Sequence, residues 1–260
     1  MYQSKKLPFR KWGFPLFSKI ASLLIQCIVA LALIYFCLIF FNQNLDFTSV
    51  WAYRSLFFHG WLITIGLSLA SLVLSLLFGL LAALFARSGI PLLTFFSNVY
   101  VEIIRGTPLL VQILFFFYVV AHSFHLENRY VAGIIILSLF NGAYIAEMIR
   151  SGIEAVSATE LESARAIGLS QFQAYRFIIF PQAIRQIIPP LTGQFASIIK
   201  DASLLSIIGV TELTNSAQQI NSATYSTLEI YIPLGLAYLI LTLPVSLWSK
   251  KLEKKFKYET

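Results

Sequence analysis

Charged residues are scarce in this sequence. Asp, Glu, Lys and Arg make up 12% of its 260 residues, whereas hydrophobic residues make up 58% and the mean hydropathy is +0.77. Soluble domains carry about 25% charged residues, so this composition excludes a soluble domain. No stretch alternates polar and apolar residues as a membrane β-barrel strand does, and open sheets cannot cross lipid because their backbone groups would stay unpaired. The sequence therefore predicts an all-α integral membrane protein, a polytopic helical bundle.

Cysteine and histidine are few as well. Cys27 and Cys37 lie ten positions apart in one predicted helix, too far to bridge each other, and we interpret them as small apolar residues. His122 and His125 are three positions apart, but no cysteine or third ligand clusters with them, as a metal site would require. We predict neither a disulfide nor a metal centre.

Catalytic motifs are missing too. The sequence contains no G-x-x-x-x-G-K-[ST] phosphate-binding loop. Its Ser, His and Asp residues form no motif that would activate a nucleophile. We therefore expect that this chain is not an enzyme and holds no cofactor of its own.

Apolar stretches of roughly 20 residues, the length that spans a bilayer, occur about six times. They cover residues 20–41, 61–86, 108–120 with a polar N-terminal extension, 131–148, 183–210 and 228–248. Pro189, Pro190 and Gly193 are expected to break the fifth stretch. We predict an N-terminal tail, one extra span and an outer loop in residues 1–57, a five-helix core in 58–249, and a basic tail in 250–260.

Basic residues lie mainly on one side of this topology. They occupy the N-terminal tail, Arg87, the loop 154–190 with its flanks, and the C-terminal tail, whereas the opposite loops hold Arg54 and Arg129. Because Lys and Arg accumulate in cytoplasmic loops, both termini are predicted to be cytoplasmic. Anionic lipid headgroups account for the formal net charge of +7, so no nucleic-acid partner is expected.

The loop 154–190 is polar and carries signals for a short helix. Thr159 followed by Glu162 predicts a capping box at the start of that helix, with Ser157 followed by Glu160 as the alternative start. Gly168 can adopt the left-handed conformation that ends a helix.

A second short helix is predicted after this glycine. Ser170 and Gln173 form another capping box, and Pro181 is expected to end the helix. Two interpretations compete. The loop either closes against the bilayer surface, or it is a lever that transmits force from a cytoplasmic protein into whose groove it fits.

The loop resembles a known signature. ESARAIG at 162–168, followed by nine residues and then IIFP at 178–181, is similar to the EAA motif of binding-protein-dependent ABC importer permeases, which reads E-A-A, three residues, G, nine residues, I-x-L-P. Ser163 and Phe180 replace the more common Ala and Leu. The resemblance implies that five residues couple the permease to its ATPase: Glu162, Ala164, Gly168, Ile178 and Pro181.

Three further stretches resemble the polar amino-acid branch of that family. They are EIIRGTPLLVQ at 102–112, GAYIAEMIRSGI at 142–153 and FPQAIRQIIPPLTGQFASIIKDASLLSIIGVTEL at 180–213. The resemblance implies a permease subunit of a polar amino-acid importer in the bacterial inner membrane. It also implies a second permease, either a copy or a paralogue, an extracytoplasmic solute-binding protein, and ABC ATPase subunits that bind ATP and Mg.

Several charges fall within or at the ends of predicted spans. A charge at the centre of a span costs about 2.5–3.5 kcal/mol on insertion scales, so each should face water or a partner. Four residues are candidates for a polar substrate path: Glu102, Arg105, Lys200 and Asp201. The alternative is that they are interhelical pins or reach the interface along their side chains.

Local spacing predicts two ion pairs. Glu102 and Arg105 lie three positions apart on one helical face, and Glu147 precedes Arg150 by the same spacing near a helix end. Two other functions stay open: a permease of the same build for an opine or organic anion, and a membrane scaffold or sensor subunit that conducts nothing.

Overall fold

The computed structural model describes residues 28–32, 34–36, 39 and 45–257, and every regular element among them is a helix. The all-α class is therefore confirmed. The chain divides into two units, residues 1–46 and 47–260. In the first unit the described residues 28–32, 34–36 and 39 are helical. Cys27, Cys37 and the rest of the predicted first span lie outside the described residues.

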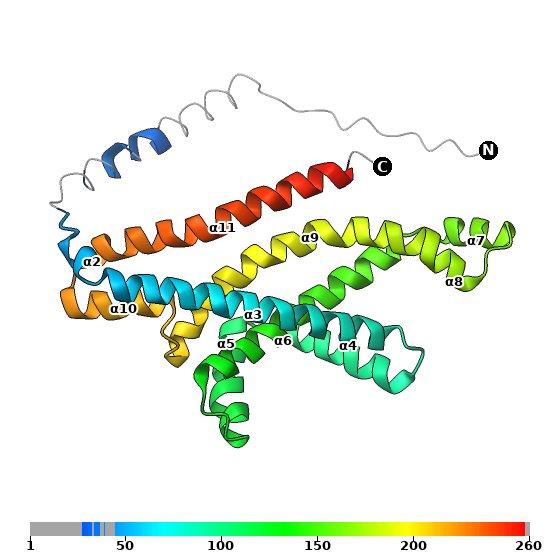
Figure 1. The fold of residues 1–260 in the computed structure, drawn as a ribbon, viewed down its shortest axis with the longest axis horizontal. Helices are drawn as coiled ribbons and strands as arrows, with labels where there is room; N and C mark the ends of the chain where they lie inside the picture. The colour runs from blue at the N-terminus through cyan, green and yellow to red at the C-terminus, as the bar shows by residue number, and fades with distance from the viewer. Residues whose placement is uncertain (1–27, 33, 37–38, 40–44, 258–260) are drawn as a thin grey trace. The chain divides into compact units, whose positions relative to one another are not determined.

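The second unit is a bundle of long helices joined by short ones (Figure 1). In chain order its elements are α2 (Thr48–Ala52), α3 (Arg54–Ala86), α4 (Pro91–Gly106), α5 (Leu109–Phe115), the π-helix η1 (Phe116–Ala121), α6 (Arg129–Glu154), α7 (Ala158–Ala166), α8 (Gln171–Ala174), the π-helix η2 (Tyr175–Ile179), α9 (Phe180–Asp201), the 3₁₀-helix η3 (Ala202–Ile208), α10 (Leu213–Thr224) and α11 (Thr227–Lys257).

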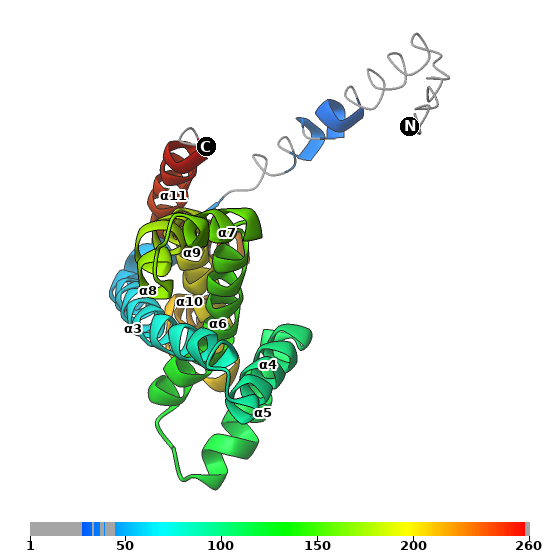
Figure 2. The same ribbon diagram turned by 90° about the vertical axis from the view of Figure 1, so that its right-hand side faces the viewer.

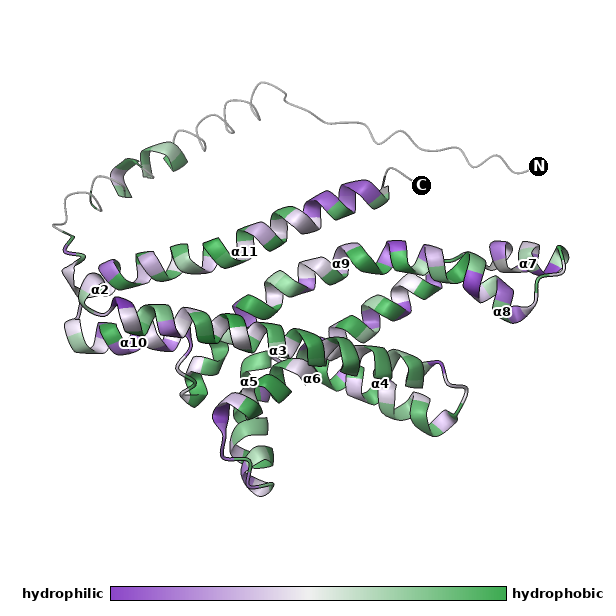
Figure 3. Ribbon diagram, in the orientation of Figure 1, coloured by the Kyte–Doolittle hydropathy of each residue, from purple (hydrophilic) through white to green (hydrophobic). Residues whose placement is uncertain are grey.

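Three of the described helices, α3, α6 and α11, are long and apolar enough to cross a membrane. Together α4 and α5–η1 could form a fourth span, bent by 111°. The predicted span 108–120 is thus the second half of a bent pair. The bend falls where Pro108 offers no backbone N–H to continue α4. Figure 3 shows apolar residues along α3 and α4 and hydrophilic ones around α7 and α8. The count of six spans stays a prediction.

The α3–α6 contact is made possible by glycine. A Cβ atom on Gly79 would lie 2.6 Å from Cγ2 of Ile145 and 2.9 Å from the carbonyl oxygen of Gly142. Small residues allow such close approach between membrane helices, where packing replaces the hydrophobic effect. The Tyr100 hydroxyl of α4 donates to the Leu139 carbonyl of α6 at 2.5 Å, and Figure 2 shows α4 beside these helices.

Helix α9 runs unbroken through Pro189, Pro190 and Gly193, so the predicted break there is wrong. Hydroxyl groups support the helix at this point, since Thr192 donates to the Pro189 carbonyl at 2.8 Å and also bonds Ser249 of α11 at 2.8 Å. Membrane helices tolerate proline where neighbouring groups of this kind compensate. The helix instead changes character after Asp201, where η3 leads to the turn at Gly209.

A buried apolar cluster holds η3 against the bundle. It joins Leu67 of α3, Ile113 of α5, Leu137 of α6 and Leu205 of η3, the last three of which are fully buried. This cluster fixes the end of α9, and with it the position of Asp201, relative to three other helices.

Candidate functional site

The polar loop begins at Ser157, whose Oγ accepts a hydrogen bond from the Glu160 amide at 3.3 Å. The alternative start is therefore correct, and the prediction that Thr159 caps the helix is wrong. An N-cap needs non-helical backbone, which Ser157 has with ψ of 145°, whereas Thr159 lies inside α7.

Gly168 ends α7 as predicted, with φ of +83°. The Leu169 amide donates to the Ala164 carbonyl at 3.1 Å and the Gly168 amide donates to the Arg165 carbonyl at 3.0 Å. This is the paired hydrogen-bond pattern of a Schellman motif, which satisfies the last carbonyls of a helix. The turn that separates α7 from α8 is therefore fixed by its own backbone.

The second capping box is confirmed. Ser170 Oγ accepts from the Gln173 amide at 3.3 Å, and the Gln173 side chain accepts from the Ser170 amide at 2.8 Å. The helix does not end at Pro181 as predicted, because α8 continues through η2 into α9. Pro181 is the second residue of α9, directly after η2. The π-helix η2 accommodates the junction, and such segments are frequent at functional sites.

The loop is rich in polar residues, but it also exposes large apolar side chains. Ile167 is 76% exposed and Phe172 is 78% exposed. Ala164, in contrast, is buried within the loop at 1% exposure. Of the other predicted coupling residues, Glu162, Gly168 and Pro181 are exposed and Ile178 is half-buried. The loop thus has an inner face that packs and an outer apolar face that is mostly exposed.

A group of charges joins α4 to α6, at the end of the bundle where α7 and α8 lie. Arg105 pairs with Glu147 at 3.4 Å and its guanidinium lies 5.6 Å from the centre of the Tyr144 ring. The predicted pair between Arg105 and Glu102 is therefore wrong, because α4 brings Arg105 over α6 instead. The predicted pair of Glu147 with Arg150 is confirmed.

The remaining candidate charges lie elsewhere, at the end of α9. Lys200 is exposed, whereas Asp201 is half-buried and interacts with the side chain of Asn141 in α6. Asn141 is fully buried and accepts a hydrogen bond from Gln194 of α9 at 2.5 Å. The four candidates therefore form two separate groups. Sequence reasoning missed Asn141 and Gln194, although an amide in the middle of an apolar span was a signal for an interior polar contact.

A second polar group missed from the sequence surrounds Glu212, the N-cap of α10. Its carboxylate accepts hydrogen bonds from the Thr214 and Asn215 amides at 2.9 and 2.8 Å and from the Tyr238 hydroxyl at 2.8 Å. Thr64 of α3 donates to it at 3.4 Å. Burial raises the pKa of the Glu212 carboxyl, against the lowering effect of these bonds. Glu212 thus ties α3, α10 and α11 together.

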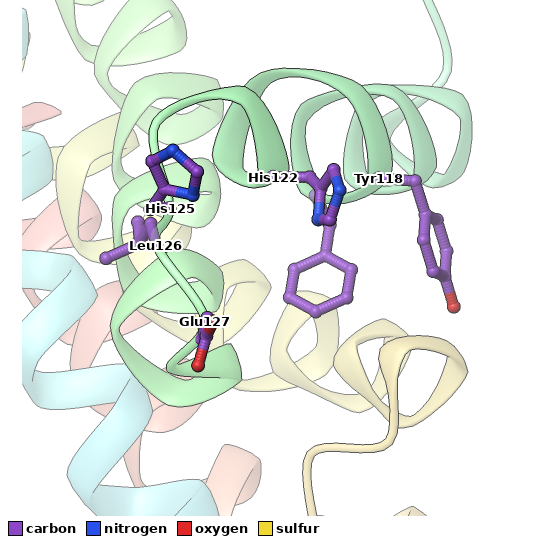
Figure 4. Close-up of a pocket in the computed structure, with 6 residues that line it drawn as sticks. Tyr118, His122, His125, Leu126 and Glu127 are labelled. Atoms are coloured by element: carbon purple, nitrogen blue, oxygen red, sulfur yellow. The ribbon is translucent and has the colours of Figure 1, made fainter.

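A cavity of about 420 Å³ opens at the turn between η1 and α6 (Figure 4). Tyr118 and His122 line the cavity from the helix, and His125, Leu126 and Glu127 line it from the turn that follows. The backbone of His125 is left-handed, with φ of 53°. In residues 45–257 and the shorter described segments, no three His, Cys, Asp or Glu side chains gather as metal ligands.

Comparisons with known proteins agree with this architecture. Residues 75–258 match the family described as "Binding-protein-dependent transport system inner membrane component". The glutamine transport system permease protein GlnP of Escherichia coli (strain K12) is 33% identical over 217 residues, which cover 83% of this chain and 99% of that protein. The chain therefore belongs to the family of binding-protein-dependent transport system inner membrane components.

Solved structures show the same fold. A crystal structure of an amino acid ABC transporter with histidines matches with a TM-score of 0.76 and 36% identity, covering 82% of this chain and 100% of that one. The MetNI methionine ABC transporter in an inward-facing conformation matches with a TM-score of 0.56 and 16% identity, covering 80% of this chain and 97% of that one. The second match concerns the fold alone. The chain is a multi-pass membrane protein of the permease type.

Proposed function

We propose that this chain is the permease subunit of an ATP-driven ABC importer for polar amino acids. It acts in the bacterial inner membrane with both termini cytoplasmic, beside a second permease and below an extracytoplasmic solute-binding protein. The names of the similar glutamine and amino acid transporters support the substrate class. ATP and Mg belong to separate ATPase subunits.

The observation that carries this proposal is the capped loop with its exposed apolar face. Ile167 and Phe172 present large apolar surfaces that water does not stabilise, and the Schellman turn at Gly168 holds the loop in shape. Such a face fits a hydrophobic groove on the ATPase. Because Ala164 is buried, it contributes by packing α7 inside the loop. Glu162 and Gly168 are exposed, which supports their contact with the partner.

The polar groups inside the bundle form the path for the solute. Asp201 offers a carboxylate at the end of α9, next to the exposed Lys200, and the buried Asn141 side chain of α6 interacts with it. Polar groups at membrane depth are expensive unless they pair or meet water. A water-filled path between two permease subunits supplies that environment.

Reconstitution tests the proposal. The chain is placed in proteoliposomes with its ATPase and its solute-binding protein, and uptake of radiolabelled glutamine is measured with and without ATP. ATP-dependent accumulation supports the importer. Stimulated ATP hydrolysis without uptake would identify a scaffold or sensor instead, and exclusive retention of an opine or organic anion by the binding protein would change the substrate class.

Cross-linking separately tests whether the exposed apolar face with Ile167 and Phe172 docks on the ATPase. With Ile167→Cys, a bifunctional reagent should capture the ATPase in native vesicles. Arg87→Cys, in the turn after α3, is the matched control and should give less product. If Ile167→Cys captures phospholipid alone, the loop lies on the bilayer and does not dock.

A further inference from the structure

A cavity of about 410 Å³ lies between α3, α4 and α6. Its floor is made of small side chains, among them the buried Ala82, Ala83 and Ala146. Ser97 and Asn98 of α4 add polar groups to its wall. Four charged residues also line it: Glu102, Arg105, Glu147 and Arg150. A cavity lined by apolar groups and a few convergent charges is typical of a small-molecule site.

The ion pairs in this cavity are unequal. Arg150 holds both oxygens of Glu147, through Nε at 2.8 Å to Oε2 and through Nη2 to Oε1. Arg105 reaches Glu147 through one contact at 3.4 Å. Glu147 therefore keeps a charged partner when Arg105 leaves it, whereas Arg105 has no second carboxylate within ion-pair distance among the described residues. Arg105 is the group that can change partner.

Arg105 is also accessible. Its side chain is 40% exposed, close to the 43% of Arg150 and more than the 23% of Glu147. The Tyr144 ring holds the guanidinium from the side, which limits its movement without using its hydrogen-bond donors. Glu102 lies one helical turn earlier on α4, exposed and without an ion pair in the described part of the chain. Side chains at this spacing are neighbours on a helix surface.

The charge pattern selects the kind of ligand. Arg105 and Arg150 are opposed by Glu102, Glu147 and, through Arg150, Glu154. An anion alone, such as a lipid phosphate, would meet an excess of carboxylates. A zwitterion suits both Arg105, which can change partner, and the unpaired Glu102, because its carboxylate can bind the Arg105 fork and its ammonium can bind Glu102.

We propose that this cavity is a binding station for the α-carboxylate and α-ammonium groups of an amino acid, in which the substrate carboxylate displaces Glu147 from Arg105. The assignment rests on the proposed transport function and adds to it a defined station at the α7 end of the bundle, with an exchange of ion pairs. Glu147 retains Arg150 throughout, so the exchange leaves no charge uncompensated.

Equilibrium binding to the permease–ATPase complex in nanodiscs tests this station. The probes are radiolabelled glutamine and the same molecule with its α-carboxylate converted to an amide. Wild type should bind free glutamine at least tenfold more tightly than the amide. Arg105→Gln should weaken binding of free glutamine by about tenfold to a hundredfold and leave binding of the amide unchanged. Arg105→Lys should keep part of the preference.

A second variant distinguishes the station from a purely structural ion pair. Glu147→Gln removes the competitor for Arg105, so free glutamine should bind about two- to fivefold more tightly. If the pair merely stabilises the fold, Arg105→Gln and Glu147→Gln would weaken binding together, and the proposal is wrong. Lys250→Gln, at the exposed end of α11, is the control and should bind both probes as wild type does.

The outcomes also separate this proposal from the transport function. If wild type accumulates glutamine in proteoliposomes but binds the amide as well as the free acid, the station is wrong and the importer stands. If wild type takes up no polar amino acid, the importer itself is wrong. Should Arg105→Gln fail to assemble with the ATPase, the wild-type preference, Arg105→Lys and Glu147→Gln decide the matter.

Discussion

The glycine contact between α3 and α6 gives a prediction with an internal control. Gly79 and Gly66 lie in the same helix, but a Cβ atom on Gly79 would lie 2.6 and 2.7 Å from Ile145 and 2.9 Å from the Gly142 carbonyl, whereas one on Gly66 meets nothing within 4 Å. Ile145 is 1% exposed and cannot swing aside, and a backbone carbonyl moves only if the helices separate. Alanine at Gly79 is therefore overpacked and alanine at Gly66 is not.

The magnitude follows from two opposing terms. Replacing glycine by alanine in a helix interior stabilises it by about 1 kcal/mol, and both variants share this gain. Overpacking costs about 1–3 kcal/mol and falls on Gly79→Ala alone. The free energy of unfolding should therefore be lower for Gly79→Ala than for Gly66→Ala by about 1–3 kcal/mol. For a chain of this size, each 1 kcal/mol corresponds to about 2–4 °C in Tm.

Thermal unfolding of the purified protein in detergent measures this difference. Ile145→Ala removes Cγ2, the atom nearest to the added methyl group, so it should recover part of the loss in the Gly79→Ala background. The two substitutions should then show a favourable coupling in a double-mutant cycle. Equal Tm values for Gly79→Ala and Gly66→Ala, or strictly additive effects with Ile145→Ala, would refute the reasoning.

Three other predictions concern the loop and the polar groups. Glu212→Ala should lower the free energy of unfolding by about 1–3 kcal/mol for each buried donor that it leaves unpaired, while Tyr238→Phe should cost about 1.5–3 kcal/mol; chemical unfolding measures both. Gly168→Val should cost about 1–2 kcal/mol of backbone strain and reduce glutamine uptake while ATP hydrolysis continues; unchanged uptake would exclude a coupling role for this turn. Asn141→Leu should reduce uptake at least tenfold at normal expression, because Gln194 and Asp201 lose the amide that positions them; uptake near the wild-type rate would exclude a positioning role for Asn141.

Local signals in the sequence predicted local structure well. The Ser170–Gln173 capping box and the left-handed Gly168 are correct because each depends on atoms within a few residues along the chain. The same reasoning chose Thr159 over Ser157 for the first cap, because two overlapping patterns fit the same segment. Only the backbone angles at Ser157 separate them.

Structural features that depend on neighbouring helices could not be predicted from local sequence. Pro189 and Pro190 were expected to break α9, but Ser249 of α11 lies 57 residues from its partner Thr192 and helps to support the helix at this point. The spacing of Glu102 and Arg105 predicted a pair within α4. Spacing alone gives no information on where α4 crosses α6, so the pair of Arg105 with Glu147 could not be predicted. The fold class, the Gly168 turn and the second capping box can thus be predicted from the sequence, whereas the internal polar contacts depend on tertiary packing.

The continuity of α9 has a mechanical consequence for coupling. A 22-residue helix is about 33 Å long, and this one runs from the loop containing α7 and α8 to Asp201 without a break. A displacement of the loop by an ATPase would therefore move both ends of α9 together. Broken at Pro189, the helix would absorb that motion midway. In the importer that we propose, the hydroxyl groups that support α9 at its prolines would therefore belong to the coupling path, since they would keep the helix stiff between the exposed apolar face of the loop and the Asn141–Asp201 contact.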